Sequence, residues 1–193
     1  HWALKKLETR TLQVNPLTFF GPTTIGKSTL LRGIELHWNS LSSKQALLTH
    51  GADYARSYAH AVETNAVGEF RDKYQQQGLV LIDDLQSLAD KPAAQQEFVN
   101  LVERRLETAA PIIISLNTSL AEQTRLSAVV LSRLAGGTQI QLHPPLPPTR
   151  RVILDQLLEQ DLALPGLFLT LVVDASHQAS SLDFALGAFP IEH

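Results

Sequence analysis

The feature that most constrains the fold is the segment at residues 21–28, Gly-Pro-Thr-Thr-Ile-Gly-Lys-Ser, which fits the pattern G-x-x-x-x-G-K-[ST] at every fixed position. An apolar run at 17–20 predicts a buried strand before it, and residues 27–38 are patterned as a helix. In this setting, glycines let successive backbone N–H groups converge on one anion, and the helix adds the positive end of its dipole. The alternative is an ordinary glycine turn between a strand and a helix.

We therefore predict a phosphate-binding loop. Lys27 would reach the β- and γ-phosphates of a nucleotide, and the Ser28 hydroxyl would bind Mg²⁺. The residues expected to contact the nucleotide are Gly21, Pro22, Thr23, Thr24, Ile25, Gly26, Lys27, Ser28 and Thr29.

A second candidate site follows the apolar run at 79–82, which ends in Asp83 and Asp84. The run predicts a central buried strand, and ligands of open α/β sheets bind at the carboxyl ends of the strands. Burying two adjacent carboxylates there costs free energy unless they bind a cation or water. We expect Asp83 to hold Mg²⁺, directly or through water, and Asp84 to orient or deprotonate the attacking water. The alternative is an Asp-Asp turn that caps the next helix.

Composition narrows the class of protein. The chain has 193 residues, is 44% hydrophobic and 18% charged, and carries a formal net charge of −3, which is ordinary for a globular protein and gives no strong nucleic-acid footprint. Cysteine is absent, which excludes disulfides and thiol catalysis, and the histidines lack metal-ligand spacing. With no membrane-length apolar stretch and no secretory signal, we expect a cytoplasmic protein. Methionine is absent even at position 1, so we expect a piece of a longer chain whose flanking domains lie outside it.

Strands and helices alternate along the chain, which predicts an α/β fold with a parallel sheet and helices on both faces. The strands expected are 17–20, 45–49, 79–83, 111–117 and 139–142, and the helices are 1–12, 27–38, 51–63, 67–76, 92–109 and 126–134. The proline-rich run at 143–148 reads as a stiff linker. We expect a nucleotide-binding base at 1–145, with a two-helix insertion at about 51–77, and a small α-helical lid at 146–193.

Several local patterns resemble the AAA+ ATPases, a class of P-loop NTPases, and within that class the ATPase domain of the bacterial replication initiator DnaA. The resemblance covers nearly the whole chain. It is carried by Asn15-Pro16-Leu17, by 65–70 with Tyr74, by Ile82 to Lys91 with 95–98, and by Ser132-Arg133-Leu134, Gly136-Gly137, Pro144-Pro145 and Thr149-Arg150.

The resemblance implies ATP or ADP as ligand with Mg²⁺, ATP hydrolysis, and assembly of an oligomer on origin DNA. Asn117 falls at the position that senses the γ-phosphate, although the family usually has aspartate there. Arg133 matches the arginine that reaches into the neighbouring subunit's nucleotide site. Read without the resemblance, Asn117 is a polar strand end and Arg133 a solvated surface residue.

The insertion resembles the element with which initiators and helicase loaders line a channel for single-stranded DNA. Lys91 and an Ala59–His60 turn fall where the family contacts the strand. Ala93 stands where a basic residue is common, so we expect weak or oligomer-dependent binding of single-stranded DNA.

The pattern breaks after Arg151, since residues 152–193 contain no lysine or arginine. The family places a phosphate-contacting arginine in its lid, and the matching positions are Ala179-Ser180-Ser181. Thr24 is a second departure, because the family favours glycine there. We expect nucleotide binding with slow hydrolysis.

Three alternatives stay open beside an initiator. The chain could belong to an initiator-related regulator that binds the replication clamp or the initiator, to a helicase-loader-type ATPase, or to a catalytically silent interaction module on the same fold.

Overall fold

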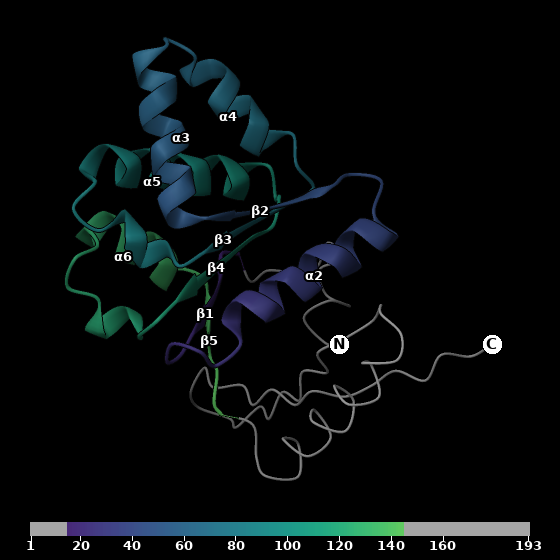
Figure 1. The fold of residues 1–193 in the computed structure, drawn as a ribbon, viewed down its shortest axis with the longest axis vertical. Coiled ribbons are helices and arrows are strands. Elements are labelled where there is room, and N and C mark those ends of the chain that lie inside the picture. Colours follow the sequence, from purple (N-terminus) through teal and green to yellow (C-terminus); the bar gives the residue numbers. More distant parts are fainter. Residues whose placement is uncertain (1–14, 145–193) are drawn as a thin grey trace.

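The computed structural model describes residues 15–144, which build one parallel sheet with helices on both of its faces (Figure 1). The expected helix at 1–12 and the expected lid at 146–193 lie outside the described residues. No helix within 15–144 combines the length and the apolar character needed to cross a membrane.

The sheet has the strand order β2-β3-β4-β1-β5, and every neighbouring pair is parallel. Its strands are β1 Leu17–Phe20, β2 Ala46–His50, β3 Leu79–Asp83, β4 Ile112–Leu116 and β5 Thr138–Gln141. The register sets Phe20 opposite Leu116 and His50 opposite Asp83. The polar residues at or after these ends therefore gather along one edge of the sheet.

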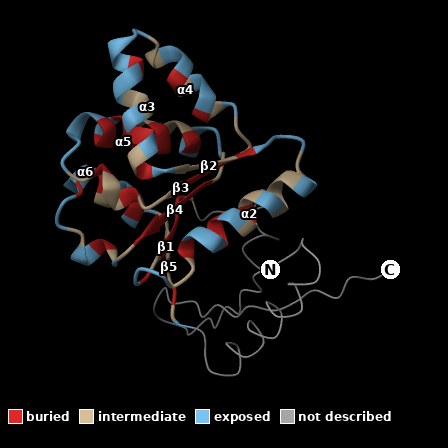
Figure 2. Cartoon of the chain, in the orientation of Figure 1, coloured by how far each residue is buried: buried red, intermediate tan, exposed pale blue. Residues whose placement is uncertain are grey.

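The connections between the strands are mostly helical. They are α2 Lys27–Leu41, α3 Gly51–Glu63, α4 Val67–Gln75, α5 Pro92–Glu107 and α6 Ala128–Ala135, with short 3₁₀ turns η1 Leu85–Leu88 and η2 Leu120–Glu122. Strand β3 is buried along its apolar length, and its side chains alternate between the two sheet faces. Leu79 and Leu81 pack in the cluster that includes α2 residues. Val80 and Ile82 pack in the cluster that includes α3, α5 and α6 residues. Figure 2 shows the buried sheet between these two helical layers.

Aromatic rings join the inserted helices α3 and α4 to each other and to α5. Tyr54 of α3 meets Phe70 and Tyr74 of α4 edge to face, with ring centroids 5.2 and 5.1 Å apart, and meets Phe98 of α5 at 6.5 Å. Such contacts fix ring orientation and add about 0.5–1.5 kcal/mol beyond the burial of apolar area. The insertion is therefore packed onto the sheet layer and does not stand apart from it.

The five strands and the five helices expected within 15–144 are present, with their ends moved by at most three residues; the largest change is at α2, which was expected to end at residue 38 and ends at Leu41. The helix expected at 126–134 begins at Ala128, because the Ser127 side chain accepts a hydrogen bond from the backbone N–H of Val130 and caps it. The helix expected to run to 109 ends at Glu107. The two 3₁₀ turns were not expected, since each is shorter than the periodicity that sequence reading can detect.

Candidate nucleotide site

The loop from Gly21 to Gly26 connects β1 to α2 in the strand–loop–helix arrangement that the motif requires. Gly26 has φ +101°, and Thr24 has φ +70°, so both lie in the left-handed region. At Gly21 a Cβ atom would lie 2.8 Å from the carbonyl oxygen of Leu142, so a larger residue does not fit there. Thr23, Ser28 and Thr29 are exposed, which leaves the outer face of the loop open to a ligand.

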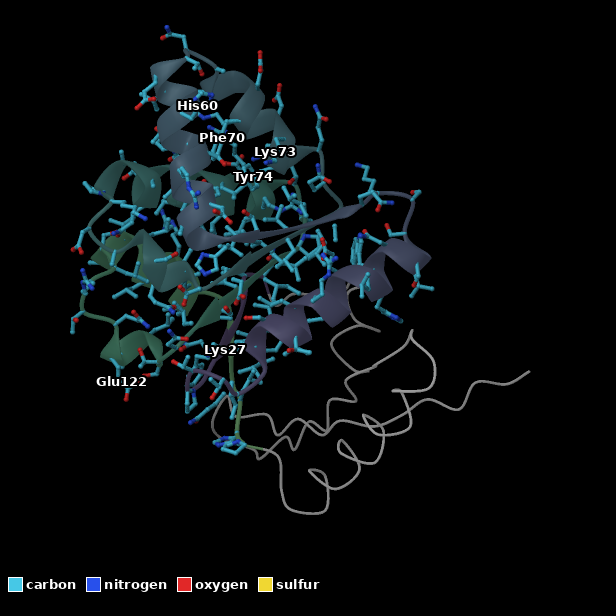
Figure 3. All side chains as sticks on the ribbon, viewed as in Figure 1. Lys27, His60, Phe70, Lys73, Tyr74 and Glu122 are labelled. Carbon is cyan, nitrogen blue, oxygen red and sulfur yellow. The ribbon has the colours of Figure 1, made fainter. Side chains whose placement is uncertain are left out.

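Lys27 is the first residue of α2 and is labelled near the start of that helix in Figure 3; its side chain folds back under the loop. The ammonium group donates hydrogen bonds to the carbonyl oxygens of Gly21 at 2.7 Å and Pro22 at 2.8 Å. Burial lowers the pKa of Lys27, while the nearby charges of Asp83 and Asp84 act to raise it. The cation and the two carboxylates therefore share one electrostatic site, although they are far apart in the sequence.

Asp83 and Asp84 are held in place by a single hydroxyl group on the neighbouring strand. Ser115 of β4 donates a hydrogen bond to Asp83 Oδ1, and its oxygen accepts one from the backbone N–H of Asp84 at 2.8 Å. Asp84 has φ +57° and ψ +54°, a left-handed conformation that turns the chain from β3 into η1. The strand end is therefore fixed by Ser115, a residue that sequence reasoning passed over.

The carboxylate of Asp84 is surrounded by donors on both oxygens. The side-chain amides of Gln86 and Asn117 donate to Oδ1, the second at 3.4 Å. His50 Nε2 lies 3.4 Å from Oδ2, and its Nδ1 accepts a hydrogen bond from the backbone N–H of Ala52 at 3.1 Å. The bond to Nδ1 places the proton of a neutral ring on Nε2, facing Asp84.

Sequence reasoning brought Asn117 to this site but missed His50 and Gln86. The signal for His50 was only its place directly after the strand expected at 45–49; the structure extends β2 to His50 and sets it opposite Asp83. The signal for Gln86 was only its inclusion in the segment that carries the family resemblance. Neither signal says that a side chain turns toward Asp84.

Arg133 and Lys91 lie apart from this cluster. Arg133 of α6 pairs with Glu103 of α5, with Nε 2.8 Å from Oε1, and both side chains are more than a third exposed. Lys91 precedes α5 and donates to the carbonyl oxygen of Ser87 at 3.0 Å. The expected turn at Ala59–His60 is wrong, because both residues belong to α3; His60 lies near the outer end of that helix, far from Lys27 in Figure 3.

The comparisons with known proteins agree with this geometry. Residues 2–141 match the family model described as the bacterial DnaA ATPase domain. The chain belongs to this family. The match favours the DnaA reading over the helicase-loader reading.

The DnaA relatives are distant in sequence. The chromosomal replication initiator protein DnaA of Limosilactobacillus reuteri is 28% identical over 148 residues, which is 76% of this chain and 34% of that protein. The chain thus spans about a third of the length of the curated relatives that it matches.

Two solved DnaA structures share the fold. Domain III of DnaA from Thermotoga maritima has a TM-score of 0.76 at 24% identity, over 85% of this chain and 71% of that one. A replication initiator DnaA bound to AMPPCP and single-stranded DNA has a TM-score of 0.72 at 24% identity, over 83% of this chain and 50% of that one.

Proposed function

We propose that this DnaA-family domain binds ATP or ADP with Mg²⁺ and hydrolyses ATP slowly, as the nucleotide-controlled part of a replication initiator that assembles on origin DNA. The observation that carries the proposal is that Lys27 lies under the loop that follows β1, while Asp83 and Asp84 end β3 at the same edge of the sheet. A cation under a loop of backbone N–H groups, facing two carboxylates, suits a nucleotide phosphate with its metal ion.

The residues at this edge fit Mg²⁺. The metal favours oxygen ligands and keeps several waters, so one hydroxyl and one carboxylate beside the phosphates suffice. Ser28 is exposed at the start of α2, and Asp83 ends β3, so these two residues would hold the ion. Bound Mg²⁺ would neutralise charge on the β- and γ-phosphates. Among residues 15–144 no group of three His, Cys, Asp or Glu side chains forms a site independent of the nucleotide.

The chain's own residues would then act on the nucleotide and the water. Lys27 would exchange the carbonyl oxygens of Gly21 and Pro22 for phosphate oxygens. Asp84 would orient the attacking water, and Asn117 would contact the γ-phosphate beside it. Arg133 would serve the site of a neighbouring subunit, where an arginine supplied in trans stabilises the transferring phosphoryl group by orders of magnitude.

The proposal of slow hydrolysis rests on the sequence of the expected lid, because residues 152–193 offer no lysine or arginine for the phosphates. Binding of single-stranded DNA is also part of the proposal. A DnaA relative is bound to a single strand in its solved structure, and Lys91 is exposed before α5. The negative net charge favours weak binding by one chain and stronger binding by an oligomer.

A thermal-shift measurement tests nucleotide binding. Mg-ATP at a hundred times its dissociation constant should stabilise the protein by about 2.7 kcal/mol. Lys27→Ala should abolish the shift, whereas Lys44→Ala, which removes an exposed lysine away from the loop, should retain it. The proposal fails if Mg-ATP produces no shift in the wild type, or the same shift in Lys27→Ala.

Turnover is measured separately on the oligomer. We expect slow hydrolysis that Ser180→Arg accelerates by restoring a cation to the lid. Brisk hydrolysis that is insensitive to Ser180→Arg would contradict the proposal of slow turnover and leave nucleotide binding standing.

A further inference from the structure

Gln86 connects the ends of two neighbouring strands through its side-chain amide. Its Nε2 donates to Asp84 Oδ1 at the end of β3, and its Oε1 accepts the backbone N–H of Asn117, which follows β4, at 3.3 Å. We infer that Gln86 is a positioning residue for ATP hydrolysis, which sets the direction of the Asp84 carboxylate. This inference rests on the proposed function.

The two contacts of Gln86 determine how its amide is oriented. A backbone N–H can only donate, so the atom that faces Asn117 must be the amide oxygen. The amide nitrogen is then the atom directed at Asp84, where it meets an oxygen that can only accept when the carboxylate is ionised. If the amide were turned over, its NH2 group would face the N–H of Asn117, and its oxygen would face Asp84 Oδ1. Gln86 therefore has one satisfied orientation.

Asp84 needs such support because its backbone leaves the strand at that point. Its left-handed φ of +57° places it outside the regular sheet, so no ladder hydrogen bond fixes the direction of its side chain. Oδ1 receives the amides of Gln86 and Asn117, and Oδ2 faces His50. Loss of the Gln86 donor leaves only the long 3.4 Å contact of Asn117 on Oδ1.

Gln86 itself stands on a rigid support. It lies in η1 between Leu85 and Leu88, both fully buried under α3 and α5. Ser87 Oγ adds a hydrogen bond to the carbonyl oxygen of Asp84 at 2.8 Å. A carboxylate that must align water within a few tenths of an ångström gains from a partner anchored in this way, since a misplacement of about 1 Å can lower the rate roughly 100-fold.

Two substitutions separate the roles of the donor and the acceptor. Gln86→Met keeps the length of the side chain and removes both hydrogen bonds, and Gln86→Glu keeps an acceptor for Asn117 but opposes a charge to Asp84. Both should lower kcat about 10- to 100-fold. The dissociation constant of AMPPCP should stay within about twofold and the melting temperature nearly unchanged, because neither phosphates nor core are touched. Gln96→Met, on the exposed face of α5, is the control and should match the wild type.

A double-mutant cycle shows whether Gln86 acts through Asp84. In an Asp84→Ala background, Gln86→Met should cause no further loss of single-turnover rate, since the group it positions is gone. Any one of three results would overturn this inference and leave the proposed hydrolysis standing. They are a wild-type kcat in Gln86→Met, equal losses of kcat and AMPPCP affinity, and additive losses in the double variant. Absence of Mg-ATP turnover in the wild type would overturn the proposed hydrolysis and this inference together.

Discussion

Arg71 of α4 and Glu97 of α5 form a two-pronged ion pair, with Nε 2.8 Å from Oε1 and Nη2 2.7 Å from Oε2. The Glu97 side chain is only 2% exposed, and Asn100 adds a hydrogen bond to Oε2 at 3.3 Å. Because α4 belongs to the insertion and α5 packs on the sheet, this pair ties the insertion to the body of the domain.

We expect Arg71→Met to lower the free energy of unfolding by about 2 kcal/mol, because it leaves the Glu97 carboxylate buried without its cation. The figure lies below the about 3–5 kcal/mol of a fully buried pair, since the Arg71 side chain is 37% exposed and partly screened by water. Urea denaturation measures the change. The matched control is Arg56→Met, whose pair with Asp53 is exposed on both sides; an equal loss there would contradict the prediction.

The same pair predicts a dependence of stability on pH. Burial acts to raise the pKa of Glu97, but the hydrogen bonds from Arg71 and Asn100 and the charges of Arg71 and Arg104 outweigh it and hold the pKa below its ordinary value. A carboxyl group whose pKa falls on folding stabilises the folded state above its unfolded pKa and loses that contribution as pH falls through the folded value. The stability gap between wild type and Glu97→Gln should therefore be full at about pH 7 and shrink below about pH 4. A gap that grows on acidification would contradict this assignment.

Arg105 should matter more for stability than any exposed arginine of the domain. It is fully buried and donates to the carbonyl oxygens of Tyr74, Gln77, Gly78 and Pro111. Burial lowers its pKa to about 10, so it remains charged at neutral pH. Arg105→Met would remove the side-chain donor of all four carbonyl groups, of which Pro111 keeps the backbone N–H of Val80, and we expect a loss of about 3–5 kcal/mol in urea denaturation. Arg104→Met, one residue earlier on α5, should cost far less; similar losses in both would refute the assignment.

Thr24→Gly should stabilise the phosphate loop. A β-branched residue at φ +70° carries a backbone strain of about 1–2 kcal/mol, which glycine removes. Glycine also loses more conformational entropy on folding, and this offsets about 0.5–1 kcal/mol of the gain. We expect a net gain of about 0.5–1 kcal/mol and a slightly tighter dissociation constant for ATP, measured by calorimetry. Thr24→Ala keeps the Cβ atom and should gain less. A weaker affinity in Thr24→Gly would mean that the threonine side chain contacts the nucleotide.

Arg133→Ala should spare the fold and lower ATP hydrolysis by the proposed oligomer. Its ion pair with Glu103 is exposed, so we expect a change in unfolding free energy of less than about 1 kcal/mol. If Arg133 acts in trans, hydrolysis should fall at least about tenfold. Mixing this variant with Lys27→Ala should restore part of the activity, because one chain supplies the arginine and the other the intact site. Activity of the mixture equal to the sum of its parts would exclude trans action.

The sheet and its helices could be predicted from the sequence because their signals are local. The run at 79–83 is apolar at every position before Asp83, and the structure makes it a buried strand with the same bounds. The closeness of Lys27 to Asp83 and Asp84 also followed, since parallel strands present their carboxyl ends at one edge. The functional roles of these residues stay predictions.

The contacts around Asp84 could not be predicted, because they depend on where side chains turn after the strands end. Ser115 lies within an apolar strand and reads as an ordinary β residue until its hydroxyl is seen between Asp83 and Asp84. Arg105 reads as one of two adjacent surface arginines on a helix. Its burial follows from the loop at 76–78 and from Pro111, whose carbonyl groups accept hydrogen bonds from the guanidinium group and lie outside the helix whose pattern the sequence shows.

The strand order has a consequence for how the domain is made. Strand β1 lies between β4 and β5, and the Asn15 side chain joins its start to β4 by accepting the N–H of Ile112 and donating to the carbonyl oxygen of Ala110. Both neighbours of β1 are synthesised more than ninety residues later. During synthesis on a ribosome, β1, which precedes the phosphate loop, therefore cannot pair with β4 and β5 until nearly all of the sheet has emerged. If the domain binds ATP as proposed, binding of ATP added during translation would measure the last step in folding of the sheet, the pairing of β1 with its two neighbours.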